Sequence, residues 1–240
     1  MLRPVEDIRR AVERRCRAHG ASHSEAARLA DVLIEAELRG RPTHGLNRLE
    51  SILKRLERRG PERPRLIEER GPLARVDGGD ESGYLVAAFA VEAAARIARD
   101  QGHALVGVRR TRHCGMLGYY AGLAAERGLV ALLFADCAPL MAPWGGTRAV
   151  LGTNPIAAAF PFSPDPILID LSTAAVTFGA LDRLRATGRP APEGTVLDAD
   201  GRPTTDPTQA KTILPFGGAK GYALGLLVQM LGGVLVGGAP

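Results

Sequence analysis

Apolar positions recur with helical spacing along the first sixty residues of the chain. Segment 4–19 has one apolar face, formed by Val5, Ile8, Val12 and Cys16. Ser22 and Glu25 have the spacing of a capping box and predict a second helix, which Gly40 ends. A third helix is predicted from Thr43 to Gly60, with an apolar face at Leu46, Leu49, Ile52, Leu53 and Leu56. This pattern predicts a compact helical unit.

The pattern changes after Gly60. A linker rich in Pro, Gly and Arg is predicted over 60–72, followed by an alanine-rich, mostly buried helix over 82–99. Further helices are predicted over 116–127, over 174–185 and from Lys220 onward. Short apolar runs predict the strands between them, over 104–108, 129–134, 156–160 and 167–171. This alternation of strands and helices predicts an α/β fold class.

Composition narrows the class of protein. The chain has 240 residues, a formal net charge of +5 and only 5% aromatic residues, without the aromatic and basic interleaving of RNA-binding modules. We therefore expect no nucleic-acid partner. Three cysteines without C-x-x-C spacing, and a first segment without an apolar leader, predict a cytoplasmic protein.

The uncharged segment 221–240 approaches the length of a membrane span. Gln229 and the glycine pairs at 232–233 and 237–238 interrupt it. We therefore expect a buried helix that breaks near Gly232, and no membrane partner.

The segment from Thr43 to Arg48 is the main candidate for chemistry. At a helix start, His44 and Arg48 would project from one face, because they are four residues apart. A titratable imidazole beside a guanidinium suits proton transfer on a small organic acid. The alternative is that Thr43 caps a helix and that the two basic side chains are solvated.

Four other segments carry candidate residues. The turn 113–118 joins a strand to a helix, either as a phosphate site or as an ordinary turn. Trp144 lies in a Gly/Pro-rich loop and either covers a site or fills a core. Asp170, at a strand end, either caps a helix or orients a catalytic group. Lys220, at a helix start, suggests an anionic partner.

Several known motifs are absent from the sequence. No two glycines are spaced i, i+2, so the dinucleotide fingerprint G-x-G-x-x-G is excluded. Segment 217–221 lacks the first Gly and the Ser/Thr of a P-loop. His113 and Cys114 are adjacent and have no second ligand pair, so we expect no metal site. A metal hydrolase using His44, His113 and Asp170 is a minor alternative.

Taken together, these segments resemble the malate/L-lactate dehydrogenase family that does not use the Rossmann fold. The family also includes ureidoglycolate, sulfolactate and diketogulonate enzymes and the piperideine/pyrroline-2-carboxylate reductases. The motifs that carry the resemblance occur in order: Arg39-Gly40-x-x-Thr43-His44-Gly45-x-x-Arg48, His113-x-Gly115-x-x-Gly118-Tyr119, Ala142-Pro143-Trp144-Gly145-Gly146, Leu151-Gly152-Thr153-Asn154-Pro155 and Pro215-x-Gly217-Gly218-x-Lys220-Gly221.

The resemblance implies a non-Rossmann α/β fold with two regions. Residues 1–72 would form a helical region for substrate and dimer contacts, and residues 73–240 a mixed-sheet region that binds NAD or NADP. It also implies a homodimer that transfers hydride between the nicotinamide and a small 2-hydroxy or 2-oxo acid. A cyclic-imine carboxylate reductase is the alternative within the family.

The resemblance also assigns roles to residues. His44 would be the proton donor and acceptor and Arg48 would bind the substrate carboxylate, while Thr43 and Trp144 would also contact substrate. His113 and Asp170 would be catalytic and would also contact the cofactor. The other expected cofactor contacts are Cys114, Gly115, Met116, Leu117, Cys137, Leu171, Ser172 and Lys220.

The sequence departs from the family pattern in three ways. Thr43 replaces a serine and keeps the hydroxyl. Asp136-Cys137 stands where the family has Asn followed by Ser or Thr, and a carboxylate there would weaken NADP binding. The family also continues beyond the position of Pro240, so a truncated, non-catalytic nucleotide-binding protein is a further alternative.

Overall fold

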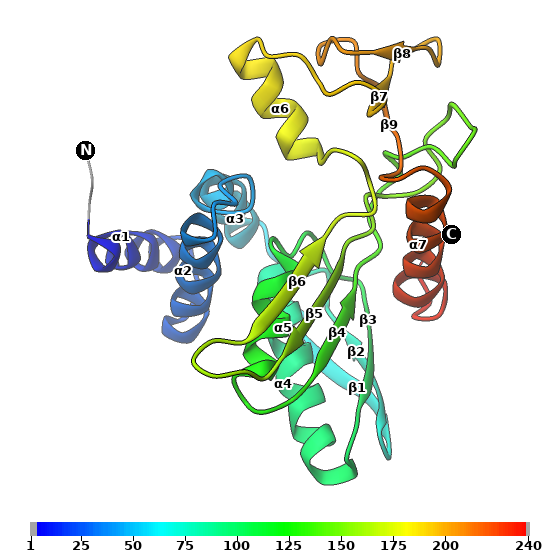
Figure 1. The fold of residues 1–240 in the computed structure, drawn as a ribbon. Coiled ribbons are helices and arrows are strands. Elements are labelled where there is room, and N and C mark those ends of the chain that lie inside the picture. The colour runs from blue at the N-terminus through cyan, green and yellow to red at the C-terminus, as the bar shows by residue number, and fades with distance from the viewer. Residues whose placement is uncertain (1–3, 239–240) are drawn as a thin grey trace. The chain divides into compact units, whose positions relative to one another are not determined.

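The computed structural model describes residues 4–238 (Figure 1). These residues form two compact units. Unit 1 comprises the described residues up to Ala131 and the segment Ala159–Leu168. Unit 2 comprises Leu132–Ala158 and the described residues from Ile169 onward. The predicted division near residue 72, with its substrate and cofactor regions, stays a prediction.

The helices of unit 1 confirm most of the predicted helical pattern. The central helix, α2, packs against α1, α4 and α5 and buries Leu29, Val32 and Leu33 completely. Its capping box is present, with the Glu25 N–H donating to Ser22 Oγ at 3.2 Å. The helical elements are α1 (Val5–Ala18), α2 (His23–Leu38), η1 (Leu46–Arg48), α3 (Leu49–Glu57), α4 (Gly83–Gln101) and α5 (Leu117–Ala125).

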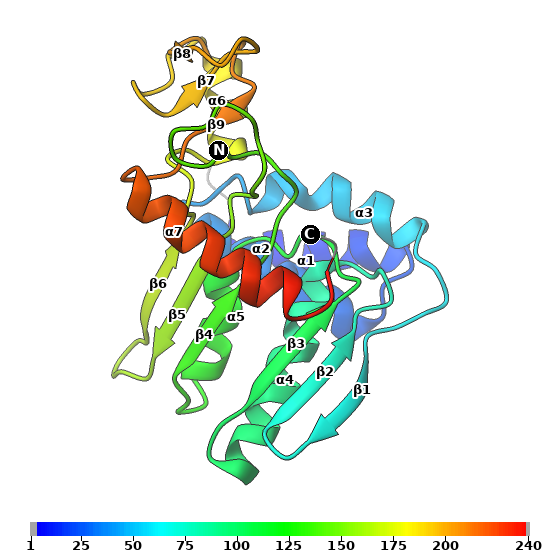
Figure 2. The ribbon, with the colours of Figure 1, turned by 90° about the vertical axis from the view of Figure 1, so that its right-hand side faces the viewer.

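Unit 1 also contains a mixed three-stranded sheet, whose strands lie side by side in Figure 2. Strand β2 (Leu73–Asp77) pairs antiparallel with β1 (Arg65–Arg70) and parallel with β3 (Leu105–Arg109). The predicted linker over 60–72 therefore contains a strand, β1, that the sequence pattern did not predict. Charges mask β1 in the sequence, and they are paired in the structure: Glu68 contacts Arg75 at 3.1 Å, and Glu69 contacts Arg96.

A second three-stranded sheet has the order β4–β5–β6. Its strands are β4 (Ala131–Phe134), β5 (Ile156–Phe160) and β6 (Ile167–Leu171). All three predicted strands are confirmed, although β4 begins two residues later than predicted. The mixed α/β class is thereby confirmed as well.

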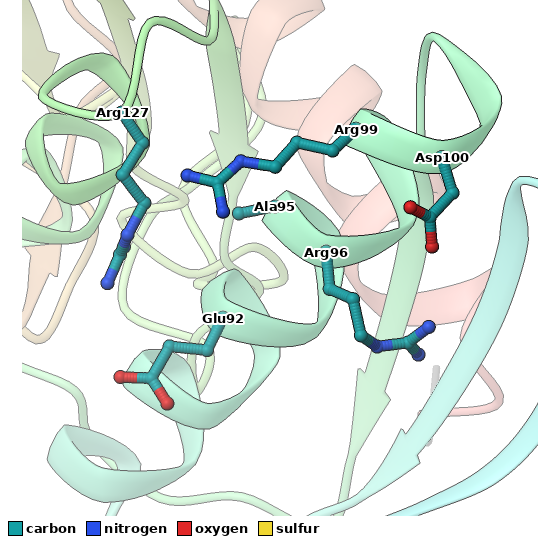
Figure 3. A pocket seen from close by; sticks show the side chains of 6 residues that line it. All are labelled: Glu92, Ala95, Arg96, Arg99, Asp100 and Arg127. Carbon is teal, nitrogen blue, oxygen red and sulfur yellow. The ribbon is translucent and has the colours of Figure 1, made fainter.

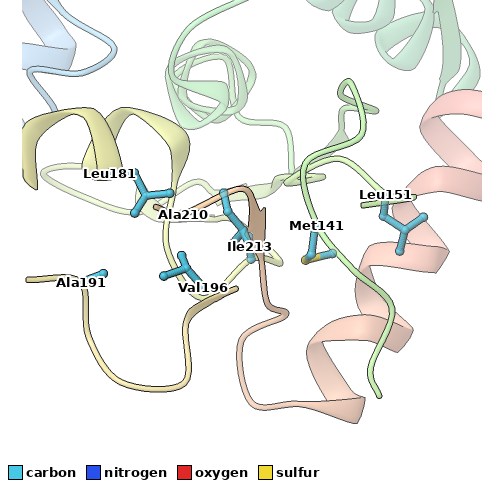
Figure 4. Packing of buried hydrophobic residues seen from close by; sticks show 8 residues of the cluster. Met141, Leu151, Leu181, Ala191, Val196, Ala210 and Ile213 are labelled. Carbon is cyan, nitrogen blue, oxygen red and sulfur yellow. The ribbon is translucent and has the colours of Figure 1, made fainter. Parts of the chain in front are cut away.

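Unit 2 has a small core beside short strands and helices (Figure 4). Helix α6 (Phe178–Thr187) begins later than the predicted residue 174, because the Thr177 hydroxyl caps it by accepting the Ala180 N–H at 3.2 Å. A sheet of three two-residue strands escaped prediction: β7 (Val196–Leu197), β8 (Pro203–Thr204) and β9 (Thr212–Ile213). The core is formed by Met141, Leu151, Ala174, Leu181, Ala191, Val196, Ala210 and Ile213.

The last helical segment changes type where the sequence predicts a break. Helix α7 (Ala219–Val228) continues as a π-helical segment, η2 (Gln229–Val234). The segment is not fully buried as predicted, since Leu226, Leu227 and Met230 are 39–46% exposed. Across residues 4–238, no helix has both the length and the apolar character needed to cross a membrane.

Candidate active site

His44 lies in a series of tight turns in unit 1, and not at the start of a helix as predicted. The His44 N–H bonds the carbonyl of Arg41, and the Gly45 N–H bonds that of Pro42. Helix α3 begins only at Leu49. The Thr43 hydroxyl lies 3.0 Å from His44 Nδ1 and therefore fixes one side of the imidazole ring.

Glu37, at the end of α2, holds these turns and was not predicted as part of the site. Its Oε1 accepts the Leu46 N–H at 2.8 Å, and its carboxyl group lies against the Gly45 Cα. A Cβ at position 45 would overlap this carboxyl group. Glu37 thus stabilises the turns that carry His44, although it lies outside the sequence motif that contains His44.

Arg48 is anchored through only part of its guanidinium group. Its Nε donates to the carbonyl oxygen of Thr43 at 2.7 Å. The two terminal nitrogens, Nη1 and Nη2, take no part in this bond. Their spacing matches that of the two oxygens of a carboxylate. Arg48 is half-buried, so an anion at this place would be partly shielded from water.

The structure brings His113 next to His44. The two ring centroids are 5.9 Å apart, with the planes inclined by 31°. His113 has a solvent-exposed surface, and the protein around the rest of its imidazole disfavours the charged form. This surrounding protein lowers the pKa of His113 to about 4, and the nearby charges of Arg48 and His44 act in the same direction. At neutral pH the His113 imidazole is therefore uncharged.

Two residues at the start of α4 seat the His113 loop. Gly83 lies under the loop, and a Cβ there would overlap the Arg112 carbonyl oxygen and come within 2.7 Å of His113. The Tyr84 ring meets His113 edge-on, with centroids 5.8 Å apart. Gly115, at φ +79°, leaves room for the Tyr84 ring, because a Cβ there would lie 2.5 Å from Tyr84 Cε1. Sequence reasoning missed Gly83 and Tyr84, which looked like ordinary helix residues.

The predicted cofactor contacts over 114–117 are mostly turned into unit 1. The Met116 and Leu117 side chains are each 5% exposed, so only their backbone groups are suited to a ligand. The carbonyl of Cys114 accepts the Tyr120 hydroxyl at 2.7 Å. The cofactor role of this segment stays a prediction.

In unit 2, Asn154 organises the segments that carry several other predicted residues. It is fully buried, at a φ of +33°. Its Oδ1 accepts the Cys137 N–H at 3.2 Å. Its Nδ2 donates to the Gly225 carbonyl at 2.9 Å and to Gln229 Oε1 at 3.0 Å. Asn154 appears in a family motif, but its position between three segments comes only from the structure.

Asp136, next to Cys137, carries a buried carboxyl oxygen. Its Oδ1 is buried and has no hydrogen-bond partner within residues 4–238. Burial raises the pKa of the Asp136 carboxyl, whereas hydrogen bonds from Gln229 and the Cys137 N–H act in the opposite direction. An acceptor atom is thus present that a ligand hydroxyl group would satisfy.

The remaining predicted residues of unit 2 lie in two places. Asp170 and Leu171 end β6, and the Ser172 hydroxyl that follows donates to the Thr153 carbonyl at 2.9 Å. Lys220 is exposed in the first turn of α7. Trp144 is 64% exposed, and its Nε1 would lie 3.2 Å from a Cβ at Gly218, the residue that precedes α7.

The candidate residues of unit 1 do not line the surface cavity of that unit that Figure 3 shows. This cavity of about 390 Å³ lies at the end of α4 opposite to Tyr84, roughly 18 Å along the helix. It is lined by Glu92, Ala95, Arg96, Arg99, Asp100 and Arg127. Within residues 4–238, no group of three His, Cys, Asp or Glu side chains is arranged to hold a metal ion.

Comparison with known proteins identifies the family. A family model described as malate/L-lactate dehydrogenase matches residues 4–240. The chain belongs to the malate/L-lactate dehydrogenase family. The resemblance found in the sequence motifs is thereby confirmed.

Relatives of the chain include enzymes named for different substrates. It is 38% identical to the L-sulfolactate dehydrogenase of Methanothermobacter thermautotrophicus over 217 residues, which are 88% of this chain and 63% of that protein. A solved dehydrogenase from Sinorhizobium meliloti is 38% identical with a TM-score of 0.92, covering 99% of this chain and 71% of that one.

The delta1-piperideine-2-carboxylate reductase from Pseudomonas syringae is 30% identical with a TM-score of 0.90, covering 100% of this chain and 74% of that one. The chain thus spans between 63% and 74% of the length of these three relatives. The non-Rossmann fold class predicted from the motifs is confirmed.

Proposed function

We propose that the protein is an NAD(P)-dependent oxidoreductase that interconverts a small 2-oxo acid and its 2-hydroxy acid. The observation that carries this proposal is the grouping of His44, His113 and Arg48 in unit 1. Members of the family named for sulfolactate and for piperideine carboxylate act on small carboxylates, which agrees with this grouping. A homodimer and a cytoplasmic location remain predictions from the family resemblance.

Arg48 would bind the substrate carboxylate. Its Nε is held by the Thr43 carbonyl, so the orientation of the guanidinium plane is set before substrate arrives. A bidentate pair fixes both the position and the plane of a carboxylate, and therefore the direction of the adjacent carbonyl carbon.

The two histidines would have different roles at the carbonyl oxygen of the substrate: His44 would transfer the proton and His113 would donate a hydrogen bond. When bound, the reduced nicotinamide supplies the hydride that adds to the carbonyl carbon. The oxygen then carries a negative charge and takes a proton from His44, whose orientation Thr43 sets; in the oxidation His44 takes this proton back. His113 is uncharged at neutral pH and would hold the same oxygen by a hydrogen bond.

Residues of unit 2 fit a phosphate-bearing nucleotide. Lys220 and the backbone N–H groups of the first turn of α7 are suited to phosphate oxygens. The unpartnered Asp136 oxygen is suited to a hydroxyl group such as those of ribose. Asp136 would disfavour a second phosphate nearby, which favours NAD over NADP.

A cyclic-imine carboxylate is the second candidate substrate, because the chain shares its fold with a piperideine-2-carboxylate reductase. The same side chains would serve it: Arg48 would bind the carboxylate and His44 would protonate the nitrogen as hydride adds to the carbon. The two substrates differ only in the atom that receives the proton.

The test uses the full 240-residue chain with NADH or NADPH and a panel of small acids: pyruvate, oxaloacetate, sulfopyruvate and piperideine-2-carboxylate. We expect oxidation of one cofactor with at least one acid. Arg48→Lys should lower kcat/KM by about 10- to 100-fold, since it loses the bidentate contact. Arg41→Lys, an exposed substitution in the same loop, should change it little. Turnover that Arg48→Lys leaves intact would contradict the proposal.

A further inference from the structure

Tyr84 carries a polar group that the fold leaves unsatisfied. Its side chain is 3% exposed, and its hydroxyl is buried without a hydrogen-bond partner within residues 4–238. Leaving a buried donor unpaired costs about 1–3 kcal/mol, so most buried hydroxyl groups in proteins find a partner. An unpaired hydroxyl at this place therefore needs an explanation.

Neighbouring tyrosines show that such pairing is available in this part of unit 1. The Tyr120 hydroxyl donates to the Cys114 carbonyl at 2.7 Å. The Tyr119 hydroxyl donates to Asp31 at 3.0 Å and accepts from Arg28 at 3.1 Å. The Tyr84 hydroxyl is thus the exception among three tyrosines of one region.

The surroundings of Tyr84 connect it with the candidate active site. Its ring meets the edge of the His113 imidazole and lies against Gly115, with the hydroxyl oxygen 3.2 Å from the place of a Gly115 Cβ. Burial raises the pKa of Tyr84, while the charge of Arg48 acts in the opposite direction. The Tyr84 hydroxyl therefore stays protonated and can donate a hydrogen bond. It lies close enough to Arg48 for the guanidinium charge to affect its pKa.

We propose that the Tyr84 hydroxyl is a further ligand of the anionic substrate and donates a hydrogen bond to the small acid that Arg48 binds. This inference rests on the proposed function. A carboxylate offers about four acceptor positions, and an Arg fork uses two of them. His113 has an exposed surface and packs edge-on against the Tyr84 ring, so this ring contacts a side chain that a ligand can reach.

The test compares two substitutions that remove one hydroxyl each, Tyr84→Phe and Tyr119→Phe. Oxalate, a small dicarboxylate, is the probe, and its Kd for the full chain is measured by titration calorimetry in the presence of NADH. Tyr84→Phe should weaken oxalate binding by about tenfold or more, as expected for a bond to a charged group. Its melting temperature should equal or exceed that of the wild type, because an unpaired donor is removed.

Tyr119→Phe should give the opposite result, with a lower melting temperature and an unchanged Kd, because its hydroxyl is already bonded within the protein. If the wild type binds oxalate and Tyr84→Phe binds it equally well, or melts at a lower temperature with an unchanged Kd, the role of Tyr84 is refuted while the proposed function stands. If the wild type neither binds oxalate nor turns over any acid, both proposals fall.

Discussion

The candidate residues of unit 1 and those of unit 2 use their polar groups differently. In unit 1, as far as residues 4–238 show, Arg48 is anchored through one nitrogen and the Tyr84 hydroxyl has no hydrogen-bond partner. In unit 2, the Asn154 amide is fully engaged with three partners. The comparison indicates that Arg48 and Tyr84 keep polar groups that a ligand could use, whereas Asn154 uses its whole amide to hold backbone segments and a neighbouring side chain.

The largest effect should come from His44→Ala. Loss of a general acid lowers kcat by about 10²- to 10⁴-fold, while the melting temperature should stay close to that of the wild type. Steady-state kinetics with the acid that the protein turns over measures kcat, and a thermal melt measures the melting temperature. His103→Ala, which removes an exposed histidine of the same unit, is the control. Full turnover by His44→Ala would show that unit 1 does not supply the proton through this residue.

Asn154→Ala should cause a large loss of stability, in contrast to His44→Ala, which should lower kcat and leave the melting temperature nearly unchanged. Its three hydrogen bonds disappear and leave buried groups unpaired, which should lower the free energy of unfolding by about 3 kcal/mol. Urea denaturation measures this change. Asn47→Ala, at the exposed asparagine, should change the stability by less than about 0.5 kcal/mol. If Asn154→Ala and Asn47→Ala were equally stable, the structural role assigned to the Asn154 amide would be wrong.

The pKa of His113 predicts a pH effect on stability. A histidine with a pKa of about 4 in the folded protein and 6.5 in the unfolded chain takes up a proton on unfolding between these values. It therefore makes the protein less stable as the pH falls from 6.5 to 4, and has no further effect below this range. His113→Asn should show a shallower loss of stability across this window in urea titrations, with His103→Asn as the control. Parallel pH profiles of His113→Asn and the wild type would refute the assigned shift.

The smallest effect concerns Asp136→Asn. Because burial raises the pKa of this carboxyl, its ionised form costs stability at neutral pH. The substitution should slightly raise the melting temperature at pH 7, and the difference should disappear below the usual carboxyl pKa of 3.8. A destabilised variant at pH 7 would mean that Asp136 is a satisfied structural group, like Asn154.

The elements that local patterns determine were predictable from the sequence. The capping box of Ser22 and Glu25 is present as expected, because both partners lie within one helical turn. The predicted helix start at Thr43 is wrong for a long-range reason. Glu37 accepts the Leu46 N–H and the Thr43 carbonyl accepts from Arg48 Nε, so Thr43 to Gly45 stay in turns and helical structure begins only with η1 at Leu46.

The candidate site was predictable only where the family motif contains it. His44, Arg48 and His113 belong to motifs, and the structure brings the two histidines together. Tyr84 and Gly83 are outside these motifs, and their contacts with the His113 loop join residues about 30 positions apart. No periodicity or short spacing reveals such a contact.

The carboxylate of Glu37 has a consequence for protein engineering. It lies at the end of α2, outside the motif, yet it receives the Leu46 N–H and packs against Gly45. The segment from Thr43 to Arg48 therefore cannot be transferred to another protein without Glu37. A graft of this loop onto another scaffold would have to include a carboxylate at the place of Glu37, together with the helix that presents it, to reproduce the orientation of the imidazole and the guanidinium.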